Sequence, residues 1–275
     1  MKRALLFLFL LPISFAYAQS KVDSLQNVLE NTIIDSIKIE TLHHLYREYK
    51  NGEIDRAKKT ILRAVTLSEQ TKNHHIKVKS YNLYANFLRS QSKDDSALVV
   101  NKKSLALARQ LGFKKGESRV LLGIGKSYWR KANFIKAREY HELNLKLVLE
   151  LKDESLIASA YSGIGNIHAQ NGEYTKAMEY YTLASQKYYN VDNLLSYAKS
   201  LDNIGFIQRS LESYESAENY FIQTDSIYKK LKNLNGQAFS TYNLGIVLPF
   251  RTTGGYVLTG YSYSTDGGCH WQSWQ

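Results

Sequence analysis

The chain has 275 residues, of which 44 % are hydrophobic and 22 % charged, a composition that indicates a folded protein and excludes a disordered one. Its one cysteine, Cys269, excludes an internal disulfide and a cysteine metal site. The formal net charge is +11, and only two prolines interrupt the chain, which favours long helices.

The segment 1–18 has the three parts of a secretory signal peptide. Lys2 and Arg3 precede an apolar run from Ala4 to Phe15, and Ala16-Tyr17-Ala18 supplies the small residues of a cleavage site. A membrane anchor is the alternative, but the run is too short for a hydrocarbon core of roughly 30 Å. We therefore expect residues 1–18 to be removed near Ala18, and the mature protein to be periplasmic or secreted.

Cleavage would leave 34 lysines and arginines against 25 acidic residues, a net charge of +9. An exported protein meets no genome, so we expect this charge to attract acidic peptides or anionic surfaces and not nucleic acid. The sequence holds no second apolar run long enough to span a bilayer, and we expect no transmembrane segment after signal cleavage.

After the signal peptide, residues 19–37 are predicted to form a capping helix, from Val22 to Glu30, and a linker. Residues 38–247 then show a 40-residue internal repeat. One column of the repeat is always alanine, and a second column, twelve residues earlier, becomes glycine in the later units. The alanines are Ala57, Ala97, Ala137, Ala177 and Ala217, and the second column is Leu45, Ala85, Gly125, Gly165, Gly205 and Gly245.

These columns have a physical cause. Small residues let two antiparallel helices approach closely, although a glycine inside a helix costs about 1 kcal/mol relative to alanine. Large apolar residues at steps of three and four form the stripe that such a contact buries. Polar breaks at 50–53, 91–93 and 170–173 divide each unit into two helices. Each unit is therefore predicted to be a helical hairpin that stacks on its neighbours.

The pattern over residues 38–247 resembles the tetratricopeptide repeat. Unit four is the clearest match, with Tyr161-Ser162-Gly163-Ile164-Gly165 in its first helix and Gly172-Glu173-Tyr174-Thr175-Lys176-Ala177 at the turn to its second. The period is longer than that of the usual tetratricopeptide repeat, which is about 34 residues. The resemblance implies an all-α fold, an α-solenoid or superhelix of about five full repeats and one partial repeat.

The sequence contains only weak matches to catalytic and ligand-binding motifs. Gly125-Lys126-Ser127 resembles the end of a phosphate-binding loop, but the motif needs a glycine where Val120 stands and a preceding strand. No histidine pair has the helical spacing of a zinc peptidase, and no nucleophile has an oriented base. We therefore predict no enzyme activity, no cofactor and no metal.

The resemblance instead implies a binding groove, because in tetratricopeptide solenoids the first helix of each unit lines the concave face. Carried over to this sequence, it predicts a basic, asparagine-lined groove for a protein or peptide partner, with acidic chemistry expected of that partner. The predicted groove residues are Lys79, Asn82, Asn86, Arg89, Lys126, Trp129, Arg130, Asn166, Lys199, Phe206 and Arg209; Arg119, Ser162, Gln170 and Asp202 extend the same stripes.

The pattern fails at residues 248–275, where Val257 stands in the alanine column. Two interpretations stay open. The tail is a small β-hairpin, because 256–259 and 261–264 flank Gly260, or it is out-of-frame sequence after a frameshift, which we favour. An uncapped solenoid end could also support self-association.

Two functions follow from these predictions. The leading one is an exported protein–protein interaction scaffold. The alternative is the truncated periplasmic sensor region of a tetratricopeptide-containing histidine kinase or regulator, which the entry segment 22–30 resembles.

Overall fold

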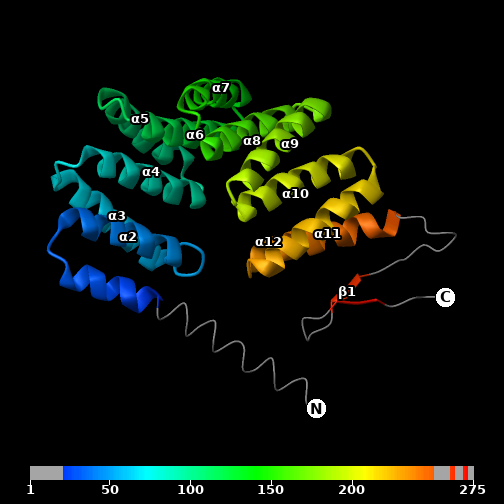
Figure 1. The fold of residues 1–275 in the computed structure, drawn as a ribbon, viewed down its shortest axis with the longest axis horizontal. Helices are drawn as coiled ribbons and strands as arrows, with labels where there is room; N and C mark the ends of the chain where they lie inside the picture. The colour runs from blue at the N-terminus through cyan, green and yellow to red at the C-terminus, as the bar shows by residue number, and fades with distance from the viewer. Residues whose placement is uncertain (1–20, 251–260, 264–268, 272–275) are drawn as a thin grey trace, which may run out of the picture. The chain divides into compact units, whose positions relative to one another are not determined.

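The computed structural model describes residues 21–250, 261–263 and 269–271. A first helix at 21–31 is followed by paired helices of nearly equal length (Figure 1). They are α2 (Asp35–Tyr49), α3 (Ile54–Gln70), α4 (His74–Ser90), α5 (Asp94–Gln110), α6 (Lys114–Arg130), α7 (Phe134–Leu151), α8 (Glu154–Gln170), α9 (Tyr174–Asn190), α10 (Leu194–Ser210), α11 (Tyr214–Lys230) and α12 (Leu234–Val247), with a short 3-10 turn, Leu248–Phe250. The predicted all-α solenoid is confirmed.

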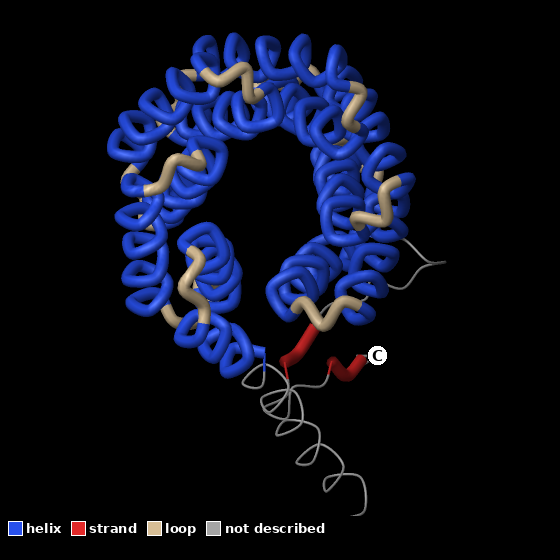
Figure 2. The backbone as a smooth tube through the Cα atoms, turned by 60° about the vertical axis from the view of Figure 1, so that its left-hand side comes forward, coloured by secondary structure: helices blue, strands red, loops and turns tan. Residues whose placement is uncertain are grey.

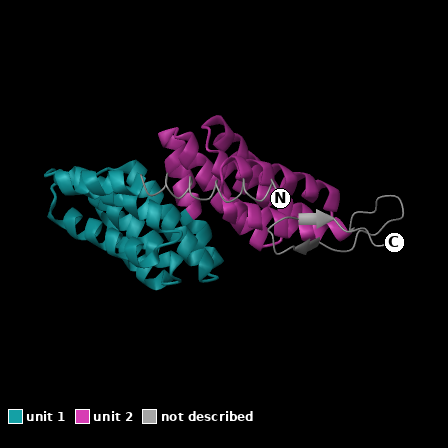
Figure 3. Ribbon diagram, turned by 90° about the horizontal axis from the view of Figure 1, so that it is seen from below, with its two compact units in different colours: residues 1–140 teal, residues 141–275 magenta. Residues whose placement is uncertain are grey.

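The chain divides into two compact units, residues 1–140 and 141–275, and the boundary falls inside α7 (Figure 3). Within unit 1, each helix from α2 to α6 packs on the next, and the even-numbered first helices also contact each other. Within unit 2, α8 to α12 pack in the same sequential way, and α10 contacts α12. Each unit is thus a stack of hairpins in which the first helices form one layer.

Short turns join successive helices (Figure 2). In the turns that follow α4 to α11, one residue has a left-handed backbone at a 20-residue spacing, at positions 92, 112, 132, 152, 172, 192, 212 and 232. The amide after it bonds back across the helix end, as in Lys93 N to Leu88 O and Asn133 N to Tyr128 O, both 2.9 Å. This is the Schellman motif, which satisfies carbonyls that the helix end leaves open. Turns within and between repeats are therefore equivalent.

Glycine occupies only two of these left-handed positions, Gly112 and Gly172. Ala132, at φ 56°, carries a Cβ that this conformation disfavours by about 1–2 kcal/mol. We expect Ala132→Gly to raise the free energy of unfolding by about 0.5 kcal/mol, because the relief exceeds the entropy cost of glycine. Urea unfolding followed by circular dichroism measures this. The same change at Ala137, inside α7, should destabilise instead, and equal effects at the two sites would contradict the prediction.

Four of the first helices begin with a side-chain cap, also at a 40-residue spacing. The residues Asn73, Asp153, Asn193 and Asn233 each accept a hydrogen bond from a backbone amide three residues on, at 2.9–3.2 Å. Such caps stabilise a helix by about 1 kcal/mol. Phe113 occupies the corresponding position before α6, where it supplies no side-chain cap.

Two glycines of the predicted column, Gly165 and Gly205, lie at close helix contacts. A Cβ added at Gly165 of α8 would lie 2.8 Å from the ring of Tyr181 on α9, and one at Gly205 of α10 would lie 2.9 Å from Phe221 on α11. A different contact joins α7 to α8, where a Cβ added at Gly163 would lie 2.4 Å from Nδ1 of the buried His141. Rings thus fit against glycines at Gly163, Gly165 and Gly205 in unit 2.

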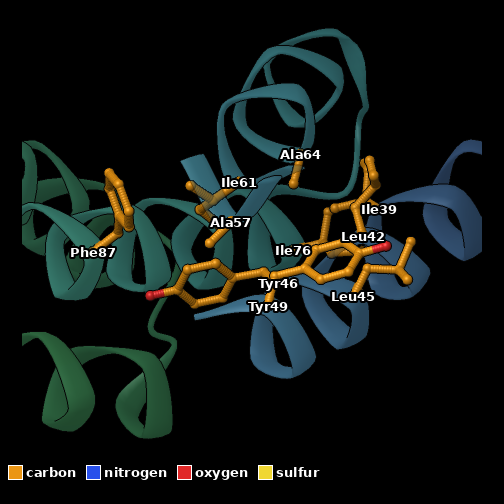
Figure 4. Close-up of a cluster of buried hydrophobic side chains, with 10 residues drawn as sticks. All are labelled: Ile39, Leu42, Leu45, Tyr46, Tyr49, Ala57, Ile61, Ala64, Ile76 and Phe87. Atoms are coloured by element: carbon orange, nitrogen blue, oxygen red, sulfur yellow. The ribbon is translucent and has the colours of Figure 1, made fainter. Parts of the chain in front are cut away.

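A hydrophobic cluster of unit 1 lies between α2, α3 and α4 (Figure 4). Aliphatic and tyrosine side chains of α2 meet the small residues Ala57 and Ala64 of α3. The helix at 21–31 covers part of this cluster with Val22, Leu25 and Leu29. These three residues are spaced by three and four, so they lie on one face of the helix.

In the tail, strand β1 (Tyr261–Tyr263) pairs antiparallel with β2 (Cys269–Trp271). Tyr261 is opposite Trp271 in the register of the two strands. The predicted strand at 261–264 is present in part, and the other predicted strand, 256–259, lies outside the described residues. The signal peptide, residues 1–18, also lies outside them.

Candidate functional site

The predicted groove residues all lie on first helices. Spacings of three, four and seven place those of one helix on one face. Lys79, Asn82, Asn86 and Arg89 lie on α4, Lys126, Trp129 and Arg130 on α6, Asn166 on α8, and Lys199, Phe206 and Arg209 on α10.

On α4, several of these polar groups bond within the fold. Asn82 donates to the carbonyl of Arg119 at 3.2 Å, which links α4 to α6. Arg89 makes the same link by donating to the carbonyl of Gly123 at 3.3 Å, and it also donates to Asn86 Oδ1 at 2.7 Å. These side chains therefore hold neighbouring first helices together, a role that the sequence analysis missed.

Arg89 is only partly accessible. Burial lowers its pKa below the usual range, the charge of Asp94 opposes this change, and that of Arg130 adds to it. Arg130 in turn forms an ion pair with Asp94, Nε to Oδ2 at 3.2 Å, and donates to Ser92 at 3.1 Å. The basic residues at this end of α4 and α6 thus share one carboxylate.

In unit 2, some of the predicted groove residues also form hydrogen bonds within the fold. Asn166 Oδ1 accepts a hydrogen bond from Tyr181 at 2.7 Å, and Arg209 donates to Asn243 on α12 at 2.6 Å. The Arg209 guanidinium also lies over the Phe206 ring, 4.8 Å from its centroid. Asp202 is buried and accepts from Tyr228, so it does not extend the exposed stripe as predicted.

The exposed members of the predicted set are mainly aromatic or lysine. Trp129 on α6 is 38 % exposed and Phe206 on α10 is 44 % exposed, while Lys126 and Lys199 are also exposed. Two exposed aromatic residues of α12 were not predicted for the groove, Phe239 and Tyr242. The 40-residue period could have found them, because they occupy the columns of Lys199 and Asp202.

Unit 1 contains two adjoining cavities, of about 490 and 350 Å³, that share the residues Lys79, Phe113 and Arg119. We call them together the unit 1 pocket. Glu40, His44 and His75 line the larger part, and Arg47 and Gly116 line the smaller. These volumes are in the range of small-ligand sites.

The charge in the unit 1 pocket is mostly positive. Lys79 forms an ion pair with Glu40. Burial acts to raise the pKa of Glu40, but the hydrogen bond and charge of Lys79 outweigh it, so this pKa is below its usual value. Arg47 and Arg119 have no ion-pair partner for their guanidinium groups within the described part of the chain.

Among residues 21–250, no three histidine, cysteine or acidic side chains gather where they could hold a metal ion. None of the described helices is long and apolar enough to cross a membrane. The site therefore offers surface chemistry, namely cations, amides and exposed rings, that suits non-covalent recognition.

This arrangement defines a class of protein, an α-solenoid of stacked helical hairpins. Within this class, residues 156–230 match the family model of the tetratricopeptide repeat. The recognition of tetratricopeptide repeats is thus confirmed. Comparison with curated protein sequences gave no match.

Three solved structures share the fold. The apo form of the quorum sensor NprR from B. thuringiensis has a TM-score of 0.63 at 15 % identity, over 90 % of this chain and 68 % of that chain. A Rap protein complexed with competence and sporulation factor has a TM-score of 0.61 at 16 % identity, over 86 % and 72 %.

The third is a signal transduction ATPase with a tetratricopeptide repeat sensor from Pyrococcus horikoshii, with a TM-score of 0.60 at 18 % identity. The match covers 86 % of this chain and 37 % of that one, so this chain spans about a third of the length of the ATPase. At identities of 15–18 %, these three likenesses show the fold, and the family match over residues 156–230 agrees with it.

Proposed function

We propose that the protein is an exported scaffold that holds a peptide or protein partner against the first-helix face of its repeats. The observation that carries this proposal is in unit 2, where an exposed ring on α10 lies against a fixed cation and a second exposed ring lies on α12. Phe206 lies under the Arg209 guanidinium, Arg209 bonds Asn243, and the adjacent Tyr242 is 65 % exposed. Exposed aromatic residues and arginine are the residue types that dominate binding hot spots.

The structural relatives support a peptide or protein partner. The Rap structure contains a bound factor, and NprR is described as a quorum sensor. Both share the solenoid fold with this chain at low identity. The basic net charge favours an acidic partner by steering it toward the surface.

The proposal predicts that Phe206→Ala combined with Tyr242→Ala weakens partner binding by about 30-fold, because a hot spot contributes about 2 kcal/mol or more. The partner is first captured from an extract of the source organism with the tagged wild-type protein and identified by mass spectrometry. Its affinity for each variant is then measured by titration calorimetry.

The matched control for these variants is Ile222→Ala, which removes an exposed apolar side chain from α11, a second helix of the same unit. It should leave the affinity within about twofold of wild type. Equal losses in the control and in the double variant would remove the first-helix face as the binding surface.

Export is the second part of the proposal, supported by the charged, apolar and small-residue segments of residues 1–18. The mass of the protein recovered outside the cytoplasm tests it. The proposal expects a chain that begins near Gln19, and an unprocessed chain confined to the cytoplasm would contradict it.

A signalling input domain is the alternative function. The similarity to a solved tetratricopeptide repeat sensor and to a quorum sensor supports it at the level of the fold. The coding DNA beyond codon 247, read in all three frames, discriminates between the two: a membrane segment followed by kinase motifs would favour the input domain.

A second copy of the chain is a further candidate partner for the scaffold. Tyr242 and Phe239 are exposed on α12, the last helix of unit 2, where a neighbouring chain could stack. Light scattering over a range of concentrations detects such self-association.

A further inference from the structure

The first observation is a break in the capping column. Four first helices begin with an asparagine or aspartate cap, whereas Phe113 occupies this position before α6. Because phenylalanine supplies no side-chain cap, α6 lacks about 1 kcal/mol of stabilisation that the capped helices have. Local choices that reduce stability without a structural gain are concentrated at functional sites. The ring of Phe113 lies in the lining of both cavities of the unit 1 pocket.

The second observation is that the neighbouring residues fit this ring. A Cβ at Gly116, in the first turn of α6, would lie 2.3 Å from Phe113 Cδ1, so glycine alone leaves room for the ring. On its other side the ring stacks on His75, with centroids 4.3 Å apart and planes 16° apart. Phe113 and His75 thus form an ordered aromatic platform from two successive repeats.

The third observation is the charge around the platform. Arg119 and Lys79 line both cavities and Arg47 lines the smaller one, while Glu40 is the one acidic residue among the described residues of either lining. Glu40 compensates Lys79, whereas the two arginines line the pocket without an ion pair to a carboxylate of the described part of the chain. Arginine binds carboxylates in a two-pronged geometry that no solvent contact reproduces.

We propose that the unit 1 pocket binds an acidic peptide segment, with its carboxylates on Arg47 and Arg119 and a neighbouring apolar side chain on the platform of Phe113 and His75. This inference rests on the proposed scaffold function and names the chemistry of a ligand for one part of it. A peptide suits the pocket better than a small anion because the lining joins cations to an aromatic surface over two cavities.

The test uses the full chain and a fluorescein-labelled peptide in which glutamate alternates with leucine. Binding is measured by fluorescence anisotropy at about 0.15 M salt, because this salt concentration screens long-range electrostatic attraction. A second peptide, with glutamine in place of glutamate, measures binding without carboxylates. Citrate, as an unlabelled competitor, represents a small carboxylate ligand. We expect the glutamate peptide to bind, the glutamine peptide to bind at least about tenfold more weakly, and citrate to compete poorly.

Two kinds of variant locate the binding. The double variant Arg47→Gln with Arg119→Gln removes two charges from the pocket, and we expect about a tenfold loss of affinity. Phe113→Asn restores the capping residue of the other repeats, so it should fold at least as stably as wild type and still lose about tenfold in affinity. The control, Lys58→Gln with Lys102→Gln, removes the same charge from exposed positions on α3 and α5 and should bind like wild type.

Equal affinities for the pocket variants and the charge-matched control would overturn the inference, since binding would then follow net charge alone. Strong competition by citrate would also overturn it in favour of a small anion. If the inference fails while partner binding still depends on Phe206 and Tyr242, the proposed function stands. If pocket binding is found and that dependence is absent, the scaffold face in unit 2 is the part that fails.

Discussion

Replacing Phe221 by alanine should lower the free energy of unfolding by about 3–5 kcal/mol. Phe221 is fully buried on α11, and its ring fills the space that Gly205 leaves on α10. It also packs on Ala217 and Val247, so one ring joins three consecutive helices. Its removal loses the transfer free energy of the ring and leaves a cavity that a hairpin stack closes only in part.

Urea unfolding followed by circular dichroism measures the effect of Phe221→Ala. The neighbour Ile222 is 51 % exposed, and its change to alanine should alter the free energy of unfolding by less than about 0.5 kcal/mol. Because the repeats couple only to their neighbours, the loss should concentrate in the denaturant transition of unit 2.

A second substitution checks that the ring and the glycine act together. Gly205→Ala alone should destabilise, because the added Cβ would lie 2.9 Å from Phe221. In the Phe221→Ala background the same change should stabilise, since it fills space and removes a helix glycine that costs about 1 kcal/mol. Additive effects of the two substitutions would contradict the ring-in-glycine packing.

Acid should destabilise the protein well above the pH at which carboxylates protonate. His43 on α2 is fully buried, and its Nε2 lies 2.8 Å from Ser80 Oγ. Burial lowers the pKa of His43 from 6.5 to about 4, against the attraction of Glu40 and together with the repulsion of Lys79.

The sign of the effect follows from proton uptake. Between pH 6.5 and 4 the unfolded chain binds a proton at His43 that the folded chain does not, so stability is complete above pH 6.5 and falls as the pH decreases toward 4. The full decrease in the free energy of unfolding is about 3 kcal/mol, of which about 2 kcal/mol should appear between pH 8 and pH 5.

Denaturant unfolding at half-unit steps of pH measures this loss. In His43→Gln, where no group titrates at the buried position, the stability should fall by about 2 kcal/mol less over the same range. His74→Gln replaces an exposed histidine and should keep the wild-type pH dependence. An unchanged slope in His43→Gln would show that His43 does not control the acid sensitivity.

The sequence predicted the helices because their packing imposes one steric requirement at regular intervals. Gly165 and Gly205 each face an aromatic ring, and each alanine of the 40-residue column faces a neighbouring helix at close distance. The pattern is therefore visible in the sequence without a structure.

The site was less predictable. The spacing of residues along a helix predicts the face on which a side chain lies, but it does not predict the hydrogen-bond partner of that side chain. Asn82 and Arg89 lie on the predicted face, but they bond carbonyls of the next first helix. The unit 1 pocket depends on Phe113, which lies in a turn and outside the apolar stripes of the helices. The capping column held a signal, because asparagine or aspartate stands at 73, 153, 193 and 233 and phenylalanine at 113.

The equivalence of the turns has a consequence for how such a protein changes length. Every helix from α4 to α11 ends in the same left-handed corner, whether the next helix belongs to the same repeat or to the next one. A 40-residue block that begins and ends at two such corners can therefore be duplicated or deleted without inventing a new connection. Growth and shortening in whole hairpins is thus the mode of variation that this backbone accommodates most readily.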